Sequence, residues 1–133
     1  MKLIIAMLAA LTVAGSALAA PNNVTLTIQH KTAGCHNWSL DGKTFSATQS
    51  FTLVRGAVVS IVNRDVMPHM LIQVSGPKAA ISTPAMNRMG AHSAIGFLHK
   101  GTYVFKTRAG EDYTKGIKTT GEDKILRLVV KVA

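Results

Sequence analysis

The sequence predicts an all-β sandwich of seven or eight short strands, preceded by a segment that is removed on export. Two observations lead to this fold class. Short runs of apolar residues, or of apolar residues alternating with polar ones, recur along residues 24–132 and are separated by Gly, Pro, Asn and Asp. No run has the 3.6-residue periodicity and the end caps of a helix. Many short strands joined by turns favour two packed sheets.

The first residues of the chain have the pattern of an export signal. Lys2 gives a positive start, residues 3–13 form an apolar run, and residues 17–19 are Ala-Leu-Ala, a small-x-small cleavage site. We therefore expect residues 1–19 to be a cleaved signal peptide and residues 20–133 to form one domain, which is periplasmic or secreted. No later apolar stretch is long enough to be a membrane span.

The first half of the predicted domain contains four strands. Residues 24–28 alternate apolar and polar side chains, as a half-buried strand does. Residues 38–40 lead into the turn Asp41-Gly42-Lys43, which ends the second strand. Residues 51–54 and 58–62 are two apolar runs separated by a glycine-containing turn, and this pattern predicts a hairpin.

The second half contains four more predicted strands. Residues 71–74 are apolar except for Gln73, and the run stops before Gly76-Pro77, a pair that interrupts a strand. The segment 75–90 contains two prolines and two methionines and is predicted to be an irregular loop. Alternating or apolar runs then predict the remaining strands, at residues 93–97, 103–105 and 126–132.

Composition limits the class of partner. The chain has a formal net charge of +9, but its Lys and Arg residues are scattered, and export argues against a nucleic-acid partner. A solvated basic surface is one interpretation; attraction to an acidic protein or to an anionic envelope surface is the other. Cys35 is the only cysteine, so it is a free thiol, an intermolecular link or a metal ligand.

Two segments resemble the cupredoxins, the family of plastocyanin and azurin. Asn63-Arg64-Asp65-Val66-Met67-Pro68-His69 is similar to the loop that carries the family's first histidine ligand. Gly101-Thr102-Tyr103-Val104-Phe105-Lys106-Thr107 is similar to the family's penultimate strand. The resemblance covers most of residues 20–133 and implies a cupredoxin-like Greek-key β-sandwich with a copper site at one end.

The sequence departs from the family where three of the four copper ligands are expected. The position of the family's cysteine is taken here by Thr107, and residues 108–117 contain no Cys, His or Met. A blue copper centre needs two histidines, a cysteine and a weak axial ligand. These ligands cannot be assembled from the usual positions, so a copper site has to use other residues.

The replacement ligands are predicted from the beginning of the domain. In a sandwich of this kind, the loop after the first strand lies at the same end as the loop that carries His69. Cys35 and its neighbour His36 lie in the former loop, and thiolate and imidazole are both copper ligands. Met89 precedes a glycine at the start of a strand and is the methionine we expect to complete the site, because thioethers favour Cu(I).

The sequence thus predicts an exported copper-binding protein with His69, Cys35, His36 and Met89 as ligands. It would act in electron transfer or in copper storage and delivery, with an acidic redox or copper-transfer protein as its partner. The alternative is a metal-free cupredoxin-like module that binds an acidic protein or an envelope surface. An enzyme is not expected, because no acidic pair or nucleophile motif is recognisable.

Overall fold

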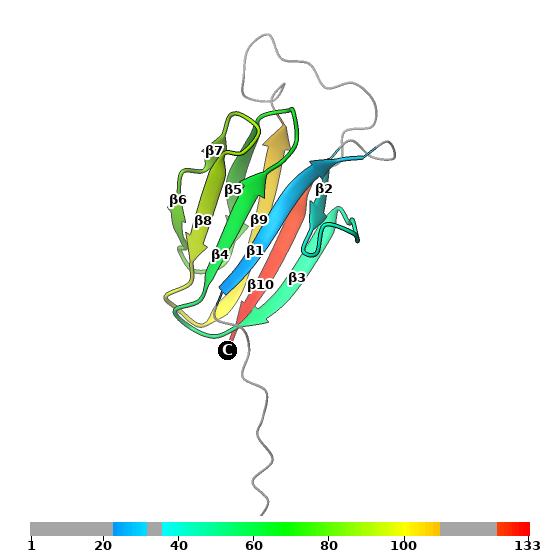
Figure 1. The fold of residues 1–133 in the computed structure, drawn as a ribbon. Coiled ribbons are helices and arrows are strands. Elements are labelled where there is room, and N and C mark those ends of the chain that lie inside the picture. Colours follow the sequence, from blue (N-terminus) through cyan, green and yellow to red (C-terminus); the bar gives the residue numbers. More distant parts are fainter. Residues whose placement is uncertain (1–22, 32–35, 110–124) are drawn as a thin grey trace, which may run out of the picture.

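The chain folds into two β-sheets packed face to face (Figure 1). A computed structural model describes residues 23–31, 36–109 and 125–133. One five-stranded sheet has the strand order β2-β1-β4-β8-β6, and the other has the order β3-β10-β9-β5-β7. The strands are β1 (Asn23–His30), β2 (His36–Ser39), β3 (Thr48–Leu53), β4 (Val58–Asn63), β5 (His69–Ser75), β6 (Ala80–Ser82), β7 (Ala85–Met86), β8 (His92–Gly96), β9 (Gly101–Ala109) and β10 (Arg127–Val132).

The predicted all-β sandwich is confirmed, but the predicted number of strands is wrong. The described residues form ten strands, and the two additional ones, β6 and β7, lie in the segment that was expected to be an irregular loop. Their three and two residues are too few to produce a recognisable period-two pattern. Thr83, with a φ of 52°, and Pro84 separate them. The strand expected at residues 71–74 also begins earlier, at His69.

The predicted hairpin of residues 51–54 and 58–62 is wrong as well. β3 pairs in parallel with β10, whereas β4 pairs with β1 and β8 in the other sheet. The glycine-containing turn therefore carries the chain across the core from one sheet to the other. Leu53 and Val59 are both fully buried, because the apolar sides of the two strands face each other from opposite layers. Turn residues between two apolar runs do not reveal whether the runs share a sheet.

The core lies between the sheets and is filled by alternate residues of their strands. Leu26 and Ile28 from one sheet and Leu128 and Val130 from the other are fully buried members of a single apolar cluster. Trp38 is also fully buried, and its Nε1 donates a hydrogen bond to the Arg127 carbonyl oxygen at 3.0 Å. The described residues contain no helix of the length and apolarity needed to cross a bilayer.

Strand direction brings the ends of β1 and β4 and the start of β2 together at one end of the sandwich. β1 and β4 are parallel, with Ile28 opposite Asn63, so both strands finish there. β2 is antiparallel to β1, with His36 opposite His30, so it begins there. The Arg64 amide donates to the Ile28 carbonyl oxygen at 2.8 Å and ties the loop after β4 to this end.

Candidate metal centre

Asn63 determines the shape of the loop between β4 and β5. Its buried side-chain amide donates to the carbonyl oxygens of Met67 at 2.9 Å and Met86 at 3.2 Å. Its Oδ1 accepts a hydrogen bond from the Asp65 amide at 2.9 Å, as in the local turns that asparagine favours. The residue thus joins the start and the end of the loop to β7, and it leaves the Asp65 side chain directed inward.

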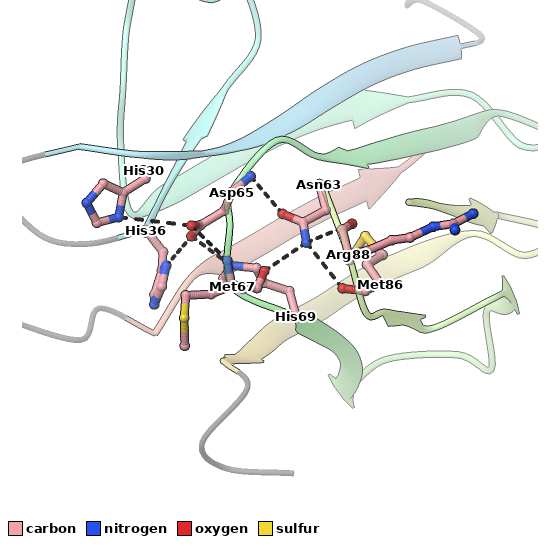
Figure 2. Close-up of polar contacts among 8 residues, drawn as sticks. All are labelled: His30, His36, Asn63, Asp65, Met67, His69, Met86 and Arg88. Carbon is pink, nitrogen blue, oxygen red and sulfur yellow. Dashed lines mark hydrogen bonds and ion pairs between the residues drawn. The ribbon is translucent and has the colours of Figure 1, made fainter. Parts of the chain in front are cut away.

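Asp65 is a fully buried carboxylate with partners on both oxygens (Figure 2). Oδ1 accepts from the Met67 amide at 3.1 Å. Oδ2 is shared by two histidine rings: it is hydrogen-bonded to His36 Nδ1 and lies 3.0 Å from His69 Nε2. Because an ionised carboxylate only accepts hydrogen bonds, each of these ring nitrogens donates an N–H to it.

The two histidines come from opposite sheets. His36 is the first residue of β2, His69 is the first residue of β5, and both are at least 99% buried. Their ring centroids lie 4.6 Å apart, and the ring planes are inclined by 87°. The loop after β1 and the loop that carries His69 were predicted to lie at the same end of the sandwich. The contact between His36 and His69 confirms this prediction.

The histidines also control the charge of Asp65. Burial by itself would raise the pKa of its carboxyl group, because it disfavours the charged form. The hydrogen bonds from His36 and His69, and then the one from the Met67 amide, outweigh burial and hold the pKa well below its ordinary value. The carboxylate therefore stays ionised inside the protein.

A third histidine borders the same carboxylate from outside. His30, the last residue of β1, has its Nδ1 4.0 Å from Asp65 Oδ1, and half of its side chain is exposed. Figure 2 places His30 and His36 beside the carboxylate, with the Asn63 side chain on its other side. The group therefore lies directly beneath a solvent-accessible histidine.

The donor atoms suit a borderline divalent cation. One ligand atom from each of His36, Asp65 and His69 lies within 4.8 Å of the other two. Imidazole binds copper, zinc, iron and nickel, and a carboxylate favours the harder, divalent states over Cu(I). All three side chains are buried, so bulk water would have little access to an ion bound between them.

The structure brings together only part of the predicted ligand set. His69 and His36 lie in the group, whereas Cys35 is outside the described residues. Met89 lies in the turn after β7, with 56% of its surface exposed. Sequence reasoning missed Asp65, because only the histidine of its loop was predicted to be a ligand. The available signal was a carboxylate four residues before the histidine within that short loop.

Comparisons with known proteins give a likeness in structure only. No protein-family model and no curated protein matches this sequence. A Cu(I) structure of a point mutant of amicyanin is 19% identical over 82% of each chain, with a TM-score of 0.46. A purple cupredoxin from Nitrosopumilus maritimus is 15% identical over 83% of this chain and 99% of that one, with a TM-score of 0.49.

A third solved structure is much larger than this chain. It is a copper-containing nitrite reductase from Thermus scotoductus, which is 18% identical over 83% of this chain but over only 22% of its own length, with a TM-score of 0.44. At these identities a likeness concerns the arrangement of the strands and assigns no ligand, substrate or partner.

Proposed function

We propose that this protein is an exported copper-binding protein whose metal is held by His36, Asp65 and His69. The observation that supports this most directly is the Asp65 carboxylate, buried with two imidazole nitrogens at a single oxygen. An ionised carboxylate beside two imidazoles offers a divalent cation one negative charge and two neutral nitrogen donors. A bound ion would replace the two protons that now lie between these atoms.

Copper is the metal favoured by this donor set. At a nitrogen and oxygen site of given geometry, Cu²⁺ binds more tightly than Zn²⁺ or the earlier divalent metals. The set contains no soft ligand among the described residues, so it favours Cu(II) over Cu(I). Copper holding and delivery is therefore the role we propose first. Electron transfer is the second role, and it requires that the same site also hold Cu(I).

The predicted ligand Cys35 is the residue that would distinguish these roles. Cys35 directly precedes His36 in the sequence, and a thiolate is a soft ligand that supports both oxidation states of copper. If its sulfur joins the site, the copper-loaded protein has a thiolate-to-copper absorption band in the visible range, and Cys35→Ser abolishes that band. If the band is absent from the parent protein, Cys35 is not a ligand, and the proposed site consists of the buried histidines and the carboxylate.

The site is tested by calorimetric titration of the purified protein with Cu(II) and with Zn(II). We expect one Cu(II) ion per chain, bound more tightly than Zn(II). His36→Ala and His69→Ala should each weaken binding by at least about tenfold, as losses of single ligands. His99→Ala is the matched control, because His99 is exposed and lies in the turn before β9. Equal Cu(II) affinity in the parent protein, H36A and H69A would contradict the proposed site.

A further inference from the structure

The outer face of the second sheet carries a group of cationic side chains. Lys106 and Arg108 lie on β9, and Arg127 and Lys131 lie on β10. Along each strand these positions alternate with buried core residues, so the cations are on the side that faces away from the core. Arg127 is directly opposite Lys106 in the pairing of the two strands, so two positive charges are neighbours. We call these four residues the basic face.

The described part of the chain offers the basic face no acidic neighbour. In residues 23–31, 36–109 and 125–133 the only acidic residues are Asp41 and Asp65. Asp65 is buried between His36 and His69, and we call these three residues the histidine group. Asp41 lies in the turn after β2, where it accepts hydrogen bonds from the Lys43 and Thr44 amides. Like charges at opposite positions of a sheet repel each other, so an anionic occupant would stabilise this surface.

A hollow of about 330 Å³ lies beside two of the cations. Lys106 and Arg127 contribute to its lining, and its apolar part comes from Val74, Val104 and Ile125. Val74 is 54% exposed and Ile125 is 66% exposed, which is unusually open for large apolar side chains that lie together. The hollow therefore combines an apolar floor with two positive charges, and this combination suits an apolar side chain flanked by carboxylates.

We propose that the basic face is the docking surface for an acidic segment of a partner protein. One apolar side chain of the partner occupies the hollow, and flanking carboxylates pair with Lys106 and Arg127. A protein segment fits better than an anionic membrane, because surfaces that enter a membrane interface present aromatic side chains such as Trp and Phe. The aromatic residues of β9, Tyr103 and Phe105, are instead fully buried.

The basic face is continuous with the end of the sandwich that holds the histidine group. Arg108 is opposite Met70 in the pairing of β9 with β5, and Met70 follows His69 directly. A partner on this face would therefore lie beside the candidate metal centre. The docking proposal itself does not depend on a metal, because it rests on the charges and the hollow alone.

The proposal is tested with a synthetic peptide in which one leucine is flanked on both sides by glutamates. Binding to the full chain, with and without copper, is measured by fluorescence anisotropy at low and at physiological salt. We expect the double variant Lys106→Glu/Arg127→Glu to bind at least about tenfold more weakly, because two close charge pairs become repulsive. A peptide with serine in place of leucine should also bind more weakly, because it leaves the hollow unfilled.

The matched control is Arg55→Glu/Lys100→Glu, which changes the net charge equally at two exposed turns outside the basic face. Peptide affinity should be nearly unchanged in this variant. Equal losses in both variants would overturn the proposal, because they would show attraction to net charge alone. Stronger binding to vesicles of phosphatidylcholine and phosphatidylglycerol than to the peptide, lost in the first variant only, would overturn it in favour of a membrane. Lys106→Gln/Arg127→Gln replaces the first variant if that protein does not fold.

Discussion

Asp65 Oδ2 lies 3.0 Å from His69 Nε2, although the two residues are separated by a turn that contains Pro68. The carboxylate is not on a strand, so strand pairing does not fix its position. It is fixed by the Asn63 side chain, which accepts the Asp65 amide and donates to the Met67 carbonyl oxygen. The metal affinity that we propose should therefore depend on a residue that is not itself a ligand.

Replacing Asn63 should damage both the fold and the site. Asn63→Ala removes donors from the carbonyl oxygens of Met67 and Met86 and leaves the buried Asp65 amide without its acceptor. We expect a loss of about 2–4 kcal/mol in the free energy of unfolding, because buried polar groups lose their partners. Cu(II) affinity should fall as well in molecules that remain folded. Urea unfolding and Cu(II) titration measure the two effects.

The control for this variant is Asn23→Ala, at the exposed first position of β1. It should change the free energy of unfolding by less than about 0.5 kcal/mol and leave copper binding intact. A fully stable Asn63→Ala protein with parent-like Cu(II) affinity would mean that the loop does not depend on this side chain.

Acid should destabilise the protein through Asp65. Its pKa is lower in the folded chain than its ordinary value of 3.8, so folding favours the ionised form. This contribution to stability is fully present above about pH 4 and is lost as the pH falls from there toward the lower folded pKa. We expect the melting temperature to decline steeply below pH 4 in the absence of metal.

Two variants separate Asp65 from the other carboxylates. Asp65→Asn should be less stable than the parent at neutral pH, and its melting temperature should decline less between about pH 4 and pH 3. Asp41→Asn should remove only a small part of the decline: amide hydrogen bonds from Lys43 and Thr44 lower the pKa of Asp41 too, but this carboxylate lies in an exposed turn where solvent weakens their effect. A parent-like acid profile in Asp65→Asn would mean that other groups cause the acid sensitivity.

The histidine group could be predicted from the sequence only in part. His69 was identifiable because a short polar loop delivers it at the start of an apolar run, and His36 because it lies near the end of the first strand. Asp65 was missed: its spacing of four residues before His69 was the only signal, and turn-forming aspartates are common in such loops. Its inward direction depends on hydrogen bonds from Asn63 to Met67 and Met86, and Met86 is distant in sequence.

In the fold, too, features set by neighbouring residues were predictable, and features set by residues distant in sequence were not. The alternating strands, such as β1, β8 and β10, were found because each displays its own burial pattern. The placement of β3 and β4 in different sheets was not predicted, because β3 pairs with β10, which lies far along the chain. Local patterns identify strands, whereas their partners depend on packing over the whole domain.

Met89 should matter for Cu(I) more than for Cu(II), if it completes the site as the sequence predicts. Met89→Leu preserves the size and apolarity of the side chain and removes only the thioether, a soft ligand that prefers Cu(I). We expect weaker Cu(I) binding with Cu(II) affinity nearly unchanged, measured by competition with chromophoric chelators of each ion. Met70→Leu, which makes the same change on β5, is the control. Unchanged Cu(I) affinity in Met89→Leu would remove this methionine from the ligand set.

The core and the metal centre should be separable by mutation. Leu128 is fully buried in the middle of the apolar cluster on β10, whereas the histidine group lies at one end of the sandwich. Leu128→Ala should lower the free energy of unfolding by about 2–5 kcal/mol, because it removes buried methyl groups and leaves a cavity. Cu(II) affinity measured well below the melting temperature should stay at the parent value, since no ligand moves. Leu98→Ala, at a position that is 61% exposed, should be nearly neutral in both measurements. If Leu128→Ala weakens copper binding in molecules that are fully folded, the group depends on packing between the sheets and not on its loop alone.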